Sequence, residues 1–409
     1  MRYIQEQGRV PVKGNYDVVV AGGGVAGVAA ALSARRSGRS VLLVEKSVAL
    51  GGLATIGLIN IFVPMCDGRG TKIIQGMAEE FVNLAKENGY DTLPEAWKNG
   101  ESVGLNEDAP ERYATRFSPA IFALALAERV VAEGVHVLLD SIVSRPVMHG
   151  GHCEGLIIEN KDGRSFYETG VVIDTTGDAD VLSRAGIPTV KRLNFFTYVA
   201  HAADLKSCDI AVRTNRIDNS VYWTYGGEAS LYGDRHPDGI KLFDGTLASD
   251  VTEFVLLGQK ALLDRLRGQD RFSRDITALP GMAQFRTTRR IAGDYTLTEA
   301  DKFRHFDDSI SAVCDMDARD NVYEAPYRCL IRSGYDNIIT AGRCVSADGY
   351  AWDVIRVIPP AIVTGQAAGE AAALAVERGQ DVCAIDIRML QGRLEKAGVT
   401  LHFSDKKNG

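Results

Sequence analysis

The sequence predicts an α/β protein with a discontinuous first domain and an inserted α+β second domain. A strand, a glycine turn, a small-residue helix and a second strand follow one another within residues 18–46, which is the pattern of a βαβ unit with parallel strands. A strand, a glycine turn and a helix return at residues 337–380, whereas residues 191–325 show no such rhythm. We therefore expect a first domain made of residues 1–190 and 326–409, with residues 191–325 as the insert.

The residue types of the first unit predict each of its elements. Val18–Ala21 is a short β-branched strand that the following glycines end, and Val25–Ser37 is rich in alanine, which indicates a helix packed closely on a sheet. Gly38 ends this helix, and Ser40–Lys46 is predicted to form a second buried strand. Such a unit is typical of the core of a doubly wound, Rossmann-like sheet.

Shorter strands are expected to add a small antiparallel sheet to this core. A helix that Gly134 closes leads into strands joined by tight turns at His149–His152 and Lys161–Arg164. The chain then returns to a buried strand, Val171–Asp174.

The insert has a different pattern, with irregularly spaced aromatic residues and one expected helix, Glu253–Arg267. After it, Val322–Ile339 is predicted to re-enter the main sheet, and a closing helix follows the two prolines Pro359 and Pro360.

Composition excludes several classes of function. The net charge of −7 over 409 residues argues against a nucleic-acid surface. Seven scattered cysteines without a C-x-x-C pair or zinc spacing favour reduced, buried thiols, and no metal site is expected. The N-terminal residues lack an apolar signal core and no window is apolar enough to insert in a membrane, so we expect a cytoplasmic protein.

The glycine motif Gly22–Gly27 reads G-x-G-x-x-G directly after a strand and at the start of a helix. Gly22 permits the tight turn, Gly24 lets the backbone approach a pyrophosphate, and Gly27 lets the helix press on the strand. Glu45, at the end of the second strand, is placed to accept hydrogen bonds from a ribose diol. These features together predict a dinucleotide site, with NAD and FAD both open at this point.

Three further segments favour FAD. The pair Gly51-Gly52 follows the acidic strand end, a Thr-Gly-Asp turn ends with Gly177 and Asp178, and "AGR" at 341–343 precedes the closing helix. Taken alone, the glycine pair is equally well an ordinary turn, and Asp178 a helix cap. Together with the glycine motif, these segments resemble the FAD-dependent oxidoreductases of the glutathione-reductase-like superfamily, and more loosely fumarate reductase and thiazole-synthase flavoproteins.

The resemblance implies one FAD and a set of residues around it. These residues are Gly22, Gly24, Val25, Ala26, Gly27, Glu45 and Lys46 for the ADP half, Val143 for adenine, Gly52, Leu53, Ala54 and Thr55 beside the flavin, and Gly177, Asp178, Gly342, Arg343 and Pro360 around the remainder. Many relatives carry Asp where this chain has Arg343, which leaves its contact open between the pyrophosphate and the ribitol side.

The C-terminal segment is best interpreted as the far half of the same nucleotide site, because its turn lacks the full glycine motif. The positive end of a helix that begins near Pro360 can stabilise negative charge at the N1/O2 edge of a flavin. The alternative is a helix start with no such role.

Arginines are the main candidates for substrate contact. Arg286, Arg289 and Arg290 lie close together, and their forks suit a carboxylate or phosphate, although surface salt bridges are an equal alternative. If this segment is a strand, Arg286 and Arg290 share one face. His305 could act as an acid or base, but a structural role is favoured.

Residues that precede the closing helix are expected near the flavin ring by chain order, among them Tyr350, Asp353 and Arg356, together with Trp352. We predict Arg356, Arg290, Tyr350 and Asp353 as the catalytic set.

The predicted function is hydride transfer between flavin N5 and a small organic substrate, for which the arginines favour an anion. Because no second glycine motif is visible, oxygen, a quinone or a carrier protein is expected as electron acceptor. The alternatives are a flavoprotein subunit of a larger electron-transfer assembly, and a biosynthetic enzyme that uses its dinucleotide without redox chemistry. An oligomer is compatible with the sequence.

Overall fold

The computed structural model describes residues 4, 8–98 and 112–403. Its largest sheet has, within this part of the chain, seven strands in the order β5-β2-β1-β8-β7-β6, with β16 beside β8. Strands β5, β2, β1, β8 and β16 run parallel. The strands are β1 (Val12–Ala21), β2 (Val41–Val44), β5 (His136–Leu138), β6 (Ile142–His149), β7 (His152–Asn160), β8 (Gly163–Asp174) and β16 (Ile338–Thr340). The α/β fold class is therefore as predicted, with strands from both ends of the chain in one sheet.

Hairpins extend this sheet as the turn signals predicted. The antiparallel pair β6 and β7 meets at His149 and His152, and β7 and β8 pair up to Asn160 and Gly163. The small antiparallel sheet is thus continuous with the parallel one through β8, which pairs with β7 over residues 163–168 and with β1 over residues 166–174.

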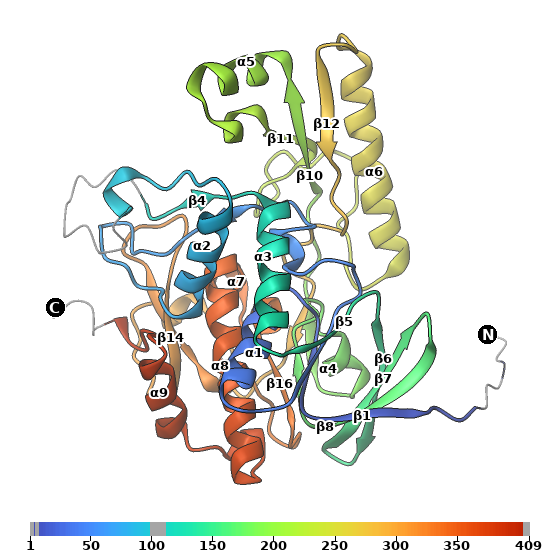
Figure 1. Ribbon diagram of the computed structural model, residues 1–409, viewed down its shortest axis with the longest axis vertical. Helices are drawn as coiled ribbons and strands as arrows, with labels where there is room; N and C mark the ends of the chain where they lie inside the picture. Colours follow the sequence, from blue (N-terminus) through green and yellow to red (C-terminus); the bar gives the residue numbers. More distant parts are fainter. Residues whose placement is uncertain (1–3, 5–7, 99–111, 404–409) are drawn as a thin grey trace.

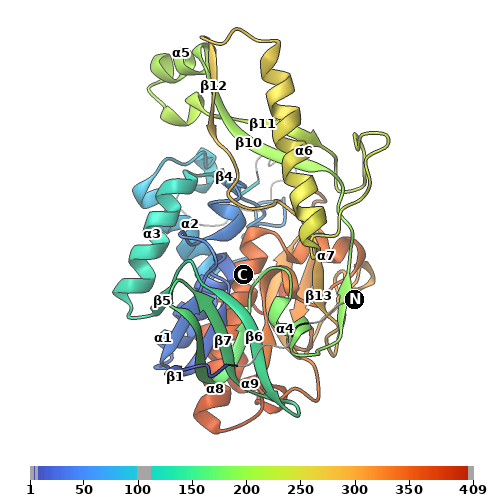
Figure 2. The same ribbon diagram turned by 90° about the vertical axis from the view of Figure 1, so that its right-hand side faces the viewer.

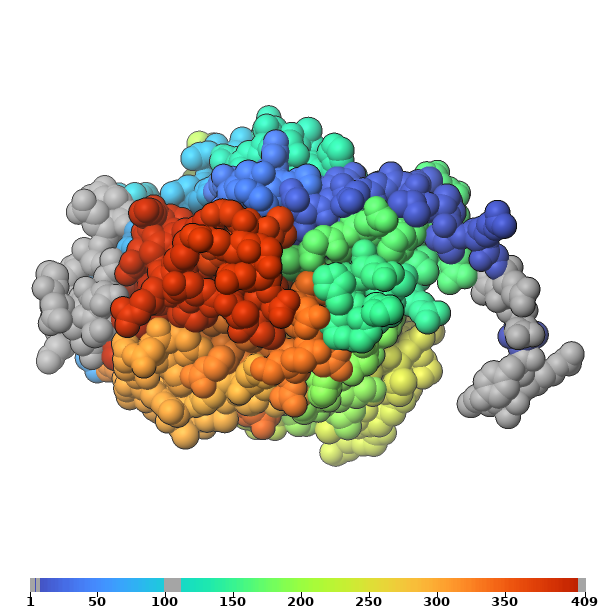
Figure 3. Space-filling view, turned by 90° about the horizontal axis from the view of Figure 1, so that it is seen from below, coloured from blue at the N-terminus to red at the C-terminus, as the bar shows by residue number. Residues whose placement is uncertain are grey.

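Helices α1 (Val25–Arg36) and α8 (Ile358–Arg378) lie side by side against the sheet, although they come from opposite ends of the sequence (Figure 1). Small residues allow this approach: a Cβ on Gly365 would lie 2.2 Å from the Ala26 carbonyl oxygen. The space-filling view from below shows the N-terminal and C-terminal segments, blue and red, side by side on this face (Figure 3). Both ends of the chain therefore contribute to one buried layer.

Further helices pack around the main sheet and this layer. Helix α3 begins after Ser118, whose side chain accepts the Ile121 N–H and caps the first turn. These helices are α2 (Met77–Asn88), α3 (Pro119–Ala132), α4 (Asp180–Arg184), α7 (Gly349–Ile355) and α9 (Ile387–Lys396). In the described part of the chain, no helix is both long and apolar enough to cross a bilayer.

A second, smaller layer stands above the main sheet, formed by a three-stranded antiparallel sheet and a long helix (Figure 2). Its elements are β10 (Thr197–Asp204), β11 (Tyr222–Glu228), β12 (Arg274–Ala278), α5 (Leu205–Thr214) and α6 (Ala248–Arg267). Phe196, Phe243, Phe254 and Phe285 form a core of its own. The predicted helix at 253–267 is present and begins earlier, at Ala248.

The prediction that Val322–Ile339 re-enters the main sheet is wrong for most of that stretch. β15 (Val322–Pro326) pairs with β14 (Ser309–Cys314) in a separate two-stranded sheet, and β16 alone joins β8. The other two-stranded sheets are β3 (Ile61–Phe62) with β4 (Thr115–Arg116), and β9 (Thr189–Lys191) with β13 (Arg289–Ile291).

The domain boundaries stay a prediction. Leu297, Ile310 and Val313 fall inside the predicted insert but pack into the core beneath the main sheet. We therefore propose that the inserted unit is shorter than residues 191–325 and ends near β13.

Candidate functional site

A cavity of about 580 Å³ lies where β1, β2 and β8 end, at the edge where parallel strands present their carboxyl ends. Residues from both ends of the chain line it. Of the predicted cofactor residues, those that line it are Gly22, Gly24, Val25, Ala26, Glu45, Lys46, Gly52, Leu53, Ala54, Val143, Gly177, Gly342 and Arg343. The structure therefore brings the two glycine-turn segments together at one site.

Four predicted cofactor residues do not line the cavity: Gly27, Thr55, Asp178 and Pro360. Gly27 is a packing position, because a Cβ there would lie 1.8 Å from the Gly22 carbonyl oxygen. Thr55 shapes the glycine-pair loop by donating its hydroxyl to the Leu50 carbonyl at 2.6 Å. These two residues position the site from behind.

The glycine turn is held by Glu45, whose carboxylate is buried. The Gly23 N–H donates to Glu45 Oε2 at 2.6 Å, and the Ser47 N–H donates to Oε1 at 2.7 Å. Gly22 has φ +107°, which favours glycine at this sharp turn. Glu45 thus fixes the turn and still lines the cavity, where its remaining lone pairs are available to a hydroxyl.

The start of α1 has the properties of an anion site. No side chain caps its first turn, and a Cβ built on Gly24 would meet no atom within 4 Å. The first backbone N–H groups of the helix therefore stand beside open space, where the helix dipole favours negative charge. The Gly51 N–H donates to the Gly23 carbonyl at 2.8 Å, so the glycine-pair loop lies against the same turn. This cradle fits the diphosphate and ribose of FAD.

Arg343 connects three segments at the rear of the cavity. Its Nε donates to the Gly177 carbonyl at 2.6 Å, Nη1 to the Phe285 carbonyl at 2.5 Å, and Nη2 to Asp178 Oδ1 at 2.7 Å. Arg343 lines the cavity, yet each of its guanidinium nitrogens donates to the protein. The structure favours a positioning role for it over the phosphate pairing considered from the sequence.

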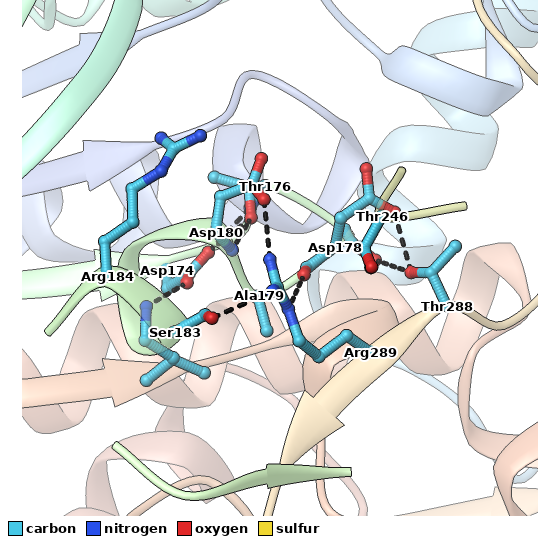
Figure 4. A network of polar contacts seen from close by, with 12 residues as sticks. Asp174, Thr176, Asp178, Ala179, Asp180, Ser183, Arg184, Thr246, Thr288 and Arg289 are labelled. Atoms are coloured by element: carbon cyan, nitrogen blue, oxygen red, sulfur yellow. Dashed lines mark hydrogen bonds and ion pairs between the residues drawn. The ribbon is translucent and has the colours of Figure 1, made fainter. Parts of the chain in front are cut away.

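Asp178 does not cap a helix, because the residue before α4 is Ala179 and no side chain caps that helix. Asp178 accepts a hydrogen bond from Arg343. It also accepts one from the Thr288 hydroxyl, at 2.7 Å (Figure 4). The Thr-Gly-Asp turn is therefore tied to the segment that carries the predicted substrate arginines.

Arg289 is a structural residue in the same network (Figure 4). Its guanidinium donates to Asp180 Oδ1, the Ser183 hydroxyl and the Asp178 carbonyl, each at 2.8 Å. This agrees with the expectation that at least one of the three arginines faces structure.

Arg286 and Arg290 do not share a strand face, because β13 contains Arg290 and begins after Arg286. Arg290 is buried away from the cavity, donates to the Ile291 carbonyl at 3.1 Å, and lies 5.6 Å from the Trp352 ring centroid. Its predicted catalytic role is not supported by this position. Arg286, by contrast, lines the cavity.

Arg286 has an unusual electrostatic setting. Burial, followed by the positive charge of Arg356, lowers its pKa to about 10. Its Nη1 donates to the Ala229 carbonyl at 3.2 Å. Among the described residues, no carboxylate lies within ion-pair distance of Arg286, so its charge is poorly compensated.

Arg356 also lines the cavity and donates its Nε to Asp353 Oδ1 at 2.8 Å. Burial lowers the pKa of Arg356. Asp353 is buried behind it and accepts from Arg192 Nη1 at 3.1 Å through its other oxygen. The predicted catalytic Asp353 thus holds Arg356 in place and does not line the cavity.

Tyr350 lies outside the cavity as well, with its hydroxyl donating to Asp315 Oδ1 at 2.6 Å. Burial, together with this carboxylate, raises the pKa of Tyr350. Its ring stacks on Tyr232, with centroids 6.4 Å apart. Sequence reasoning missed Tyr232 and Met316, which line the cavity from loops that carry no recognisable motif.

The sequence is similar to a known protein family and to curated proteins. The model of a family described as FAD dependent oxidoreductase matches residues 17–192 and 259–394. Digeranylgeranylglycerophospholipid reductase of Methanoculleus marisnigri is 26% identical over 184 residues, 44% of this chain and 43% of its own. Digeranylgeranylglycerophospholipid reductase 2 of Methanothermobacter thermautotrophicus is 30% identical over 205 residues, 47% of this chain and 45% of its own. The chain thus matches less than half the length of these curated relatives.

Among solved structures, p-nitrophenol 4-monooxygenase from Pseudomonas putida superposes with a TM-score of 0.49 at 13% identity, over 91% of this chain and 83% of that one.

Proposed function

Because the chain belongs to the family of FAD-dependent oxidoreductases, we propose that it transfers hydride between flavin N5 and a small anionic organic substrate. When bound, FAD supplies the two-electron acceptor or donor for this reaction. The observation that carries the proposal is Arg286, a cavity-lining guanidinium without a carboxylate partner among the described residues. This residue gives the cavity a place for a negatively charged group.

The charges around this position favour an anion. Arg286, Arg356 and Arg192 surround a single carboxylate, Asp353, which forms ion pairs with Arg356 and Arg192. A substrate carboxylate or phosphate beside Arg286 would offset the excess positive charge in a place shielded from water. Asp317 also lines the cavity, but it is exposed.

Helix α8 contributes a second feature. Val357, Ile358 and Ala361 at its start line the cavity, and no side chain caps its first turn. The positive end of this long helix therefore faces the site and would stabilise negative charge there. Pro360 supports this role from inside the first turn, where the missing proline N–H costs no hydrogen bond.

The electron acceptor in the other half-reaction is oxygen, a quinone or a carrier protein. The proposed reaction would run on the flavin in either direction, and the curated relatives described above are named reductases.

The experiment compares flavin-loaded wild-type protein with Arg286→Met under anaerobic conditions. A panel of small carboxylates and phosphates is screened for reduction of the flavin or for reoxidation of the reduced flavin. Loss of a charged hydrogen bond should lower kcat/KM for the active compound by roughly 10- to 150-fold, with flavin content unchanged. Arg213→Met, at an exposed position on α5, is the matched control.

Equal rates in Arg286→Met and wild type would remove Arg286 from substrate binding. A flavin that responds to no small molecule, but to a partner protein, would support the electron-transfer subunit instead. A flavin that neither route reduces would support a non-redox use of the dinucleotide.

A further inference from the structure

Two histidines and a buried glutamate meet at a place remote from the flavin cavity. Glu324 lies on β15 and is fully buried, His305 precedes β14, and His402 follows α9. One potential ligand atom from each residue lies within 4.8 Å of the other two. None of the three lines the cavity beside the glycine motif.

Only one of the two carboxylate oxygens of Glu324 has hydrogen-bonding partners. Its Oε2 accepts the Phe306 N–H at 2.8 Å and lies 2.9 Å from His402 Nδ1 and 3.3 Å from His305 Nδ1. The other oxygen, Oε1, is buried and makes no hydrogen bond. A buried carboxylate oxygen without a partner is costly, and a cation bound by both oxygens of Glu324 would satisfy it.

The two imidazole rings are close together, with centroids 4.5 Å apart and an interplanar angle of 39°. Two imidazoles and a carboxylate gathered within 4.8 Å of one another are a donor set that suits a transition-metal ion.

The surroundings leave room for a further ligand. His305 and His402 line a cavity of about 670 Å³, and the His305 side chain is 59% exposed. Three arginines also line this cavity, namely Arg304, Arg328 and Arg388. Arg304 pairs with Asp301 and Arg328 with Asp308, each at 2.9 Å, so carboxylates offset these two charges. Asp307, whose Oδ1 lies 3.5 Å from His305 Nε2, adds negative charge beside the histidines.

We propose that His305, Glu324 and His402 bind a divalent transition metal, with Zn²⁺ the best match to two imidazoles and one carboxylate. Water from the open side would complete the coordination. The metal would fasten the segment that ends at His402 to the β14–β15 sheet. Backbone contacts already hold that segment, since the Ala312 N–H donates to the Thr400 carbonyl at 2.7 Å.

Isothermal titration of chelator-treated, flavin-loaded protein with Zn²⁺ tests the site, together with metal analysis after dialysis. We expect one equivalent of Zn²⁺ to bind and to raise the thermal unfolding midpoint. His305→Ala and His402→Ala should each weaken binding by at least about tenfold. His149→Ala, an exposed histidine on β6, is the control and should bind as wild type does.

Glu324→Gln keeps the shape of the buried side chain and should also weaken binding. Because that variant can fail to fold, the exposed His305 provides the decisive substitution. The proposal is overturned if wild type binds no Zn²⁺ more tightly than about 100 μM. It is equally overturned if His305→Ala and His402→Ala bind Zn²⁺ as wild type does, since the metal would then sit elsewhere.

Discussion

Replacing Gly24 by alanine should weaken FAD binding without harming the fold. Gly24 has φ −64° and ψ 175°, which alanine adopts without strain, and a Cβ there would meet no protein atom within 4 Å. The added methyl group would instead occupy the space beside the first turn of α1. That space is where the backbone must approach the FAD diphosphate.

Gly24→Ala should have opposite effects on the stability of the apoprotein and on its affinity for FAD. In the protein without FAD, Gly24→Ala should stabilise the fold by about 0.4–1 kcal/mol, because the unfolded chain loses freedom. In the complex, a methyl group forced into a packed contact costs about 1–3 kcal/mol. This corresponds to a dissociation constant for FAD that is roughly 5- to 150-fold higher.

Two further glycines make the comparison specific. Gly268→Ala, also with nothing within 4 Å of the new Cβ and φ −88°, lies at the end of α6 and should leave FAD affinity unchanged. Gly27→Ala should destabilise the fold by at least about 3 kcal/mol, because its Cβ would lie 1.8 Å from the Gly22 carbonyl oxygen.

The assay is FAD titration of apoprotein followed by flavin fluorescence, with chemical denaturation of each apoprotein in parallel. If Gly24→Ala binds FAD within about twofold of wild type, the diphosphate does not lie against this turn. If Gly24→Ala destabilises the apoprotein as much as Gly27→Ala does, Gly24 serves the fold and not the approach of FAD.

Two other predictions concern stability. Asp178→Ala should destabilise the protein by about 3 kcal/mol, because the mostly buried guanidinium of Arg343 would lose its carboxylate partner. A loss of less than about 1 kcal/mol in the free energy of unfolding, measured by urea denaturation, would contradict this. Burial lowers the pKa of His201 from 6.5, so the folded state favours the neutral ring. The stability that His201 contributes to folding is therefore present in full above pH 6.5. It is lost as the pH falls through the lower pKa of the folded state. His201→Gln should therefore lose less stability than wild type between about pH 7 and about pH 5, and equal losses would argue against a buried neutral His201.

The parts of the fold that the sequence predicted well are those encoded by neighbouring residues. The strand, the glycine turn and the helix of the first unit follow from residue types within 18–46, and both hairpin turns from short glycine-containing segments. Helix α6 was located by its spacing, with its start misplaced because Ala248 has no capping side chain before it. A local sequence pattern predicts an element correctly where local propensity and tertiary packing favour the same structure.

The failures concern contacts between distant segments. The short strand β15 fits its sequence pattern equally well beside β14 as in the main sheet, because periodicity does not choose a partner strand. Arg290 and Asp353 lie in segments that the sequence assigned to the catalytic site. In the structure, Arg290 packs beside Trp352, and Asp353 lies behind Arg356 and binds it. Arg343 and Asp178 were both assigned to the cofactor, and their mutual ion pair spans 165 residues of chain.

An anaerobic comparison of matched substrates on the flavin-loaded protein tests the proposed anion site at Arg286 most directly. Oxidised and reduced protein are each mixed with a carboxylate-bearing compound that exchanges electrons with the flavin, and with its neutral methyl ester, while the flavin absorbance is followed. We expect rapid change of the flavin absorbance with the acid, and change at least about tenfold slower with the ester. An ester that reacts as fast as the acid would contradict an anion-binding site at Arg286.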